Sequence, residues 1–219
     1  MAACGFSLDH YRDLLEAAKA GGYRLAAFDR PPRPGDLIIR HDVDLSLVAA
    51  VRVAEVEAEA GMWSTWCLMT RSAFYNLASK EGEWAMRRLR ELGGRIAHHA
   101  VWPDVDLDER FEPVVAWHNP DAEYLTEPIE GATNAMGAPW YDPPHFRSDS
   151  NHNWSHRGRH DECPHAALAA GEPEWLHLLI HPEIWAYEGG TMRATMESFL
   201  DADRASRLAH LRDDRIDLS

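Results

Sequence analysis

The segment LIIRHDVD, residues 37–44, places ionisable side chains directly after a run of apolar ones. Such a run predicts a buried strand, where carboxylates are costly unless a cation or a hydrogen-bond network receives them. Side chains alternate between the two faces of a strand, so Arg40, Asp42 and Asp44 share one face. His41 lies on the other. Two neighbouring carboxylates on one face indicate a site for acid–base chemistry or for a metal ion.

Three histidines fall at the carboxyl ends of later predicted strands. His99 ends the segment RIAHH, His118 ends VVAWH, and His181 ends LHLLIH. In a parallel α/β barrel this end of the strands carries the active site, so we expect the histidines to meet Asp42 and Asp44. Imidazole and carboxylate are ligands that zinc takes in hydrolases. The convergence favours a divalent-metal site with acid–base groups around it over a set of separate structural residues.

The elements that position these residues alternate along the first half of the chain. Apolar periodicity and terminal glycines predict helices at 7–20, 46–60 and 81–94, with a further helix at 191–214. Strands are expected at 23–28, 37–43, 63–69, 95–101, 113–120 and 144–150, with one more inside 174–185. Strands and helices in this order predict βα units around a parallel sheet.

The second half is less regular. Residues 121–143 and 151–173 are rich in proline, glycine and histidine and are expected to form long loops, which in compact domains are usually functional or mobile. The connection between the strands at 95–101 and 113–120 leaves little room for a helix. The alternation of strands and helices is therefore expected to break down after the strand at 95–101, the third strand of the main βα series.

Bulk properties exclude several classes of function. The 219 residues fit a single domain, 1–219, and a formal charge of −14 argues against nucleic acid or an anionic membrane surface as a partner. No stretch approaches the ~18 apolar residues of a membrane span, and no secretory signal is visible. The three cysteines are widely spaced and form no CxxC pair. We expect a cytoplasmic protein.

With these motifs in view, the chain resembles the polysaccharide deacetylase superfamily, the NodB-homology carbohydrate esterases. It is most similar to the branch whose first motif reads RHDVD and which is associated with surface-glycan biosynthesis. The resemblance runs through IIRHDVDLSL, STWCLMTRSAFYN, LRELGGRIAHHA, WHNP, FRSDSNHNW and LHLLIHPEIW, and so covers most of the chain. It implies a distorted, irregular (β/α) barrel of about seven strands. The implied activity is the metal-dependent removal of an acetyl group from an N- or O-acetylated sugar or glycan precursor, with zinc as the metal.

The resemblance also implies roles for single residues. In the Asp-x-Asp form of the first motif, the first aspartate is the general base and the second binds the metal, which assigns these roles to Asp42 and Asp44. The late LLxH motif supplies a general acid, which corresponds to His181 in LLIH.

The second motif departs from the family pattern. The superfamily shows His-x-x-x-His on the third strand, but here His99 is followed four residues later by Pro103, which offers no ligand. His118, at the next strand end, is the leading substitute for the missing metal ligand, and His98 is the alternative.

Three further residues are candidates for binding the carbohydrate substrate. Arg147 and Asp149 are placed to orient Asp42 or a sugar hydroxyl, and Trp154 offers an aromatic face to a pyranose ring, together with Trp140 and Tyr141.

Two other functions remain open. A degenerate barrel that binds carbohydrate or a protein partner is favoured by the missing second-motif histidine and opposed by the retained aspartates and histidines. A hydrolase of the same fold that attacks a non-sugar amide differs from the first hypothesis only in its substrate.

Overall fold

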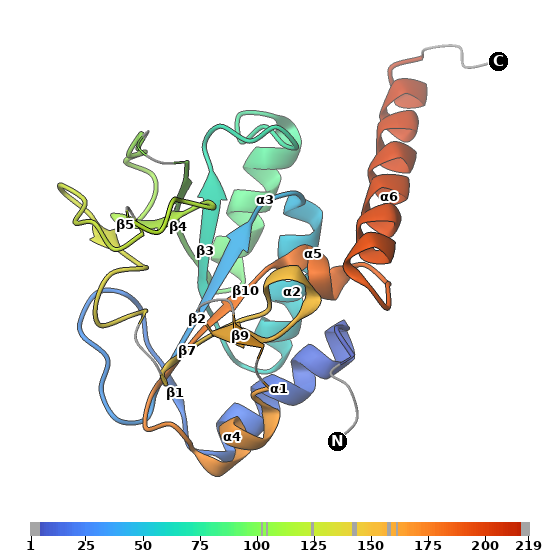
Figure 1. The fold of residues 1–219 in the computed structure, drawn as a ribbon. Coiled ribbons are helices and arrows are strands. Elements are labelled where there is room, and N and C mark those ends of the chain that lie inside the picture. The colour runs from blue at the N-terminus through green and yellow to red at the C-terminus, as the bar shows by residue number, and fades with distance from the viewer. Residues whose placement is uncertain are drawn as a thin grey trace.

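The computed structural model describes residues 5–215 except 102, 104, 124, 142–143, 157–158 and 161; for 155, 156, 159 and 160 it describes the backbone alone. A curled parallel sheet of seven strands forms a half-barrel with interleaved helices (Figure 1). Across the sheet the strands are β6 (Thr133–Asn134), β5 (Val114–Trp117), β4 (Arg95–Ala100), β3 (Thr65–Met69), β2 (Asp36–Val43), β10 (Leu176–Ile180) and β7 (Phe146–Ser148). This confirms the expected irregular barrel of about seven strands.

Three short strands extend the sheet. β1 (Arg24–Leu25) pairs in parallel with the start of β2, while β8 (Ser155–His156) and β9 (Arg159–His160) add an antiparallel pair beyond β7. Among the described residues, no helix separates β4 from β5, as the short connection predicted. The half-barrel is therefore irregular on the side where the sequence pattern was weakest.

The helices are α1 (Leu8–Ala20), α2 (Leu47–Glu59), α3 (Lys80–Glu91), α4 (His165–Ala170), α5 (Pro182–Ala186) and α6 (Met192–Asp213), with a 3₁₀ turn η1 (Ser150–His152). The first three begin after Ser7, Ser46 and Ser79, whose hydroxyls accept a backbone N–H three residues later. This is the preferred N-cap arrangement, and it explains why the predicted starts lie within one residue of the observed ones.

One prediction about the loops is wrong. α4 lies inside 151–173, which was expected to be loop throughout. Its alanine-rich sequence favours a helix, and Gly171 ends it in the left-handed conformation at φ 70°. At six residues the helix is too short for periodicity to reveal it.

The two faces of the sheet bury different cores. On the outer face, Leu37, Ile39 and Val43 of β2 pack under the helices. On the concave face, Ile38 is joined by small residues of the neighbouring strands, including Cys67, Ala97 and Ala116. Small side chains leave space inside the half-barrel near the carboxyl ends of the strands.

No helix in the described part of the chain has both the length and the apolar character needed to cross a membrane.

Candidate metal centre

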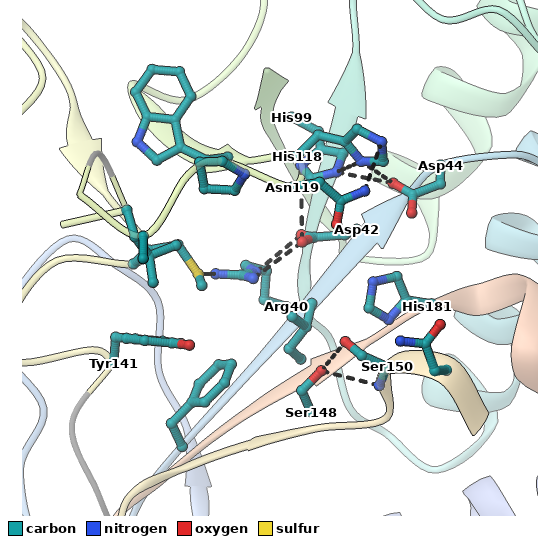
Figure 2. A pocket seen from close by; sticks show the side chains of 18 of the residues that line it. Arg40, Asp42, Asp44, His99, His118, Asn119, Tyr141, Ser148, Ser150 and His181 are labelled. Atoms are coloured by element: carbon teal, nitrogen blue, oxygen red, sulfur yellow. Dashed lines mark hydrogen bonds and ion pairs between the residues drawn. The ribbon is translucent and has the colours of Figure 1, made fainter. Parts of the chain in front are cut away.

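A pocket of about 440 Å³ lies on the concave side of the half-barrel (Figure 2). It lies at the carboxyl ends of β2, β4, β5 and β10, because these strands run parallel and end at one edge. Its lining includes the five residues that the sequence placed at strand ends: Asp42, Asp44, His99, His118 and His181. The predicted convergence is therefore present in the structure.

Three of these residues form a compact cluster of potential metal donors. The Nε2 atom of His99 lies 2.9 Å from Oδ1 of Asp44, and the Nδ1 atom of His118 lies 3.2 Å from the same oxygen. The two ring nitrogens are 3.1 Å apart. Donor atoms in a tetrahedral zinc site, with bonds of about 2.0–2.1 Å, lie about 3.3 Å from one another. The Asp44–His99–His118 group could therefore hold a metal ion.

The surroundings of His99 give a second reason to expect a cation there. Its Nδ1 lies 2.9 Å from the carbonyl oxygen of Ala116, and this contact requires Nδ1 to carry a proton. In the neutral ring Nε2 then has only a lone pair, which faces the carboxylate of Asp44. Two lone pairs at this distance repel unless a proton or a metal ion lies between them. A metal-ligating histidine typically donates its other N–H to a carbonyl in this way.

Charge in the cluster is arranged to keep Asp44 ionised. Burial opposes ionisation, but the imidazoles of His118 and His99, when they carry a proton toward Asp44, outweigh it and hold the pKa of Asp44 well below its usual range. The hydrogen bond to Asp44 in turn raises the pKa of His118, although partial burial opposes this shift. The side chain of His118 is 29% exposed and that of His99 only 2%, so the cluster is accessible from the His118 side.

His98, the alternative metal ligand, serves another purpose. Its Nε2 accepts the backbone N–H of Asp108 at 2.8 Å, and its Nδ1 lies 3.3 Å from the carbonyl oxygen of Val114. Both ring nitrogens thus hold the backbone around the β4–β5 connection. His118 is the residue that the structure brings to Asp44 and His99.

Asp42 lies beside the cluster and is paired with Arg40. The guanidinium of Arg40 contacts both carboxylate oxygens, with Nε 3.0 Å from Oδ1 and Nη2 3.1 Å from Oδ2. Nδ1 of His99 is 3.9 Å from the same carboxylate. The predicted shared face of Arg40 and Asp42 is confirmed, and the ion pair, with one hydrogen bond from Nη2 to Oδ2, holds the carboxylate within the pocket (Figure 2).

His181 is held from behind by Asp149. Its Nδ1 lies 2.6 Å from Oδ1 of Asp149, and Nε1 of Trp185 donates to Oδ2 at 2.6 Å. Burial alone would lower the pKa of His181, but the charge and hydrogen bond of Asp149 overcome it and raise the pKa to about 10. The imidazole is therefore protonated at neutral pH, with its orientation fixed.

The proposed substrate-binding residues occupy varied positions. Asp149 is fully buried behind His181, and Trp154 is buried against Phe6 and Trp185; neither lines the pocket. Arg147 also lies outside the lining, and its Nη1 donates to the carbonyl oxygens of Pro144 and Phe146. None of the three residues therefore lines the pocket, and Asp149 acts on it through its contact with His181.

The neighbouring aromatic candidates differ from each other. Trp140 is buried against Phe28, below the pocket, whereas Tyr141 lines the pocket itself (Figure 2). Tyr141 is thus the aromatic residue of the original set that a ligand in the pocket can reach.

Sequence reasoning missed three contributors. Trp185 follows His181 by one helical turn, and Asn119, beside His118, places its amide 3.3 Å from the ring Nε2. Both lie in the motifs WHNP and LHLLIHPEIW, so spacing could have suggested them. Met136 gave no such signal, and it contacts Arg40 through its sulfur at 2.8 Å.

No family model, curated protein or solved structure with which the chain was compared matches it.

Proposed function

We propose that the chain is a metal-dependent hydrolase that removes an acetyl group from an N- or O-acetylated sugar or glycan precursor, as its resemblance to the polysaccharide deacetylase superfamily implies. One observation carries the proposal: the Asp44–His99–His118 cluster shares a pocket with a fixed carboxylate, Asp42, and with a protonated histidine, His181. Amide hydrolysis needs an activated water, a base and an acid, and these groups supply all three.

The donor set suits zinc. Two imidazoles and one carboxylate, with an accessible side left open, are typical of catalytic zinc, although iron(II) and other divalent ions accept the same set. Bound there, the ion would lower the pKa of a water molecule and polarise the acyl oxygen.

The remaining roles belong to the side chains of the chain itself. Asp42, held by Arg40, takes the proton that the attacking water loses. His181, held by Asp149, gives a proton to the departing nitrogen, so that water and amide become a carboxylate and an amine. Protonation of His181 at neutral pH supports this direction of transfer.

The metal content of the purified protein is the first test. We expect about one zinc or similar ion per wild-type chain, and near-complete loss in Asp44→Ala and in His118→Ala. His210→Ala is the matched control, because it removes an exposed histidine of α6 and should keep the metal. Elemental analysis gives the stoichiometry.

The same proteins are then assayed for acetate release from N-acetylated and O-acetylated sugars. We expect turnover by the wild type and a loss of at least about 10³-fold in Asp44→Ala, because the metal supplies several kcal/mol of transition-state stabilisation. A wild type that takes up no metal after reconstitution would refute the hydrolase and leave a carbohydrate-binding barrel as the better explanation.

A further inference from the structure

We propose that the inner end of the pocket binds an acyl chain longer than acetyl, so that the preferred substrate is an amino sugar N-acylated with about four to six carbons. This inference rests on the proposed function and names the substrate class of the same site. It comes from the distribution of polar and apolar side chains along the pocket.

Polarity changes with depth along two neighbouring strands. On β10, His177, Leu179 and His181 point to the concave side in successive layers, and on β7 Phe146 and Ser148 lie level with His177 and Leu179. The pocket reaches down to Phe146 and Leu179. The pocket is therefore polar at the carboxyl ends of the strands, mixed in the layer of Leu179, which also holds Ser148 and Arg40, and apolar at Phe146 below it.

The apolar inner end is built from four side chains. Met136, Phe146 and Leu179 are each more than nine-tenths buried, and Tyr141 packs on Phe146 with ring centroids 4.6 Å apart. The sulfur of Met136 contacts Nη1 of Arg40, whereas Asp42 contacts Nη2 and Nε. Figure 2 shows Tyr141 across Arg40 from Asp44 and His181. Arg40 and Asp42 thus separate the apolar end from the metal cluster.

The opposite end of the pocket from Met136 and Tyr141 is lined by polar side chains next to His181, and we call it the polar rim. Ser150, Asn151 and Asn153 follow β7 and line the pocket there, while Asn119 lines it beside His118, at the end of β5. Side-chain amides and hydroxyls of this kind can exchange hydrogen bonds with sugar hydroxyl groups. The rim therefore suits the amine part of the substrate.

The chemistry of the site fixes which part of an amide faces which end. The departing nitrogen must face His181, since that residue protonates it. The carbonyl carbon then lies between His181 and Asp42. The alkyl chain of the acyl group points away from His181, over Arg40 toward Met136 and Tyr141. The sugar stays at the polar rim.

Size distinguishes acetyl from longer acyl groups. A methyl group is close to one water molecule in size, about 30 Å³, and would leave most of the apolar end filled with water. Each further methylene that replaces this water gains about fourfold in affinity or in kcat/KM. Two extra methylenes, as in butanoyl, are expected to raise kcat/KM about 15-fold over acetyl.

The test is a series of N-acylglucosamines with acetyl, butanoyl and hexanoyl groups, hydrolysed by the zinc-loaded protein. In parallel, ligand-observed NMR measures the binding of acetate, butanoate and hexanoate, which requires no turnover. We expect kcat/KM and carboxylate affinity to rise with chain length. Met136→Phe should narrow the inner end and abolish the preference, and Tyr141→Ala should extend it to longer chains.

Asn153→Ala is the matched control on the polar rim, and it should weaken binding of every sugar without changing the order of chain lengths. If acetyl is hydrolysed best and hexanoate binds no better than acetate, the inference is wrong while the proposed function stands. If no amide is hydrolysed, the proposed function fails and the substrate assignment fails with it, while the carboxylate affinities still decide whether the inner end of the pocket binds an acyl chain. Should Met136→Phe not fold, Tyr141→Ala tests the same end of the pocket.

Discussion

The two faces of β2 carry similar chemical groups in opposite surroundings. On the concave face, Asp42 pairs with Arg40 beside a pocket that ligands can enter. On the outer face, His41 pairs with Glu57 of α2 and is completely buried, with Nε2 2.7 Å from Oε1. Adjacent residues of one strand thus belong to a site and to a structural core.

The outer network surrounds the carboxylate of Glu57. Oε1 of Glu57 also accepts the hydroxyl of Tyr11 at 2.6 Å, and Oε2 accepts that of Ser64 at 2.6 Å. The ring of His41 stacks on Trp66 at 3.8 Å. Both oxygens of the Glu57 carboxylate therefore have partners within the protein, whereas the buried Nδ1 of His41 has no hydrogen-bond partner among the described residues.

The concave face is arranged differently. There Asp44, His99 and His118 turn donor atoms toward one another and toward open space, an arrangement that is stable only with a bound proton or metal ion. A buried ionisable residue by itself therefore says little about function. The useful distinction is whether its side chain lines an open pocket, as Asp44, His99 and His118 do, or is enclosed in the core, as His41 and Glu57 are.

Apart from the loss of the metal ligands, the largest effect on the concave side is expected from Asp149→Asn, which keeps the shape and removes the charge behind His181. Turnover should fall about 10²- to 10⁴-fold, the range of general acid catalysis. Even against the desolvation of burial, His181 has a pKa of about 10; without Asp149 it should fall toward or below its ordinary 6.5. NMR titration of the imidazole measures this directly.

The sign of the pH dependence follows from these values. Between pH 6.5 and about 10 the wild type keeps His181 in its acid form while the variant loses it. The ratio of wild-type to variant rates should therefore grow as the pH rises through this window. A constant ratio would remove His181 from the role of acid.

The corresponding change on the outer side is Glu57→Ala. It leaves the partners His41, Tyr11 and Ser64 buried without an acceptor, and breaking such a pair costs about 3–5 kcal/mol of unfolding free energy. Urea denaturation measures the loss. Glu57→Gln, which keeps an acceptor and the volume, should lose only about 1 kcal/mol.

The metal content of the folded Glu57 variants tests whether the two faces of the sheet are independent. Because the network lies across the sheet from the cluster, the folded fraction should bind metal like the wild type. Loss of metal from folded protein would show that the two faces are not independent.

An effect smaller than those of Asp149→Asn on turnover and Glu57→Ala on stability is expected at Trp185, the residue that touches both regions. Trp185 donates to Asp149 and packs on Tyr11, with ring centroids 5.3 Å apart. Trp185→Phe removes a hydrogen bond to a charged group and should cost about 2 kcal/mol of stability, with turnover reduced less than tenfold. Trp175→Phe is the control, since that buried indole stacks on His145 at the start of the half-barrel. Equal losses in the two variants would mean that the bond to Asp149 contributes nothing.

The order of helices and strands in the first half could be read from the sequence because periodicity and serine caps are local signals. The strand around 37–43 and the helices after Ser7 and Ser46 are clear cases. The segments 121–143 and 151–173 were not resolved into β6, β8, β9 and α4, since two-residue strands and a six-residue helix carry too little pattern.

By itself the sequence determined that Asp42 and Asp44 share a face opposite His41, because side-chain alternation is a property of the strand backbone. Tertiary structure alone decided that His118 meets His99, through the pairing of β4 with β5, in which His99 lies opposite Ala116. It also decided that Asp149 lies behind His181 instead of facing a sugar. Both outcomes depend on which strands become neighbours and in what register, and that follows from packing the whole half-barrel.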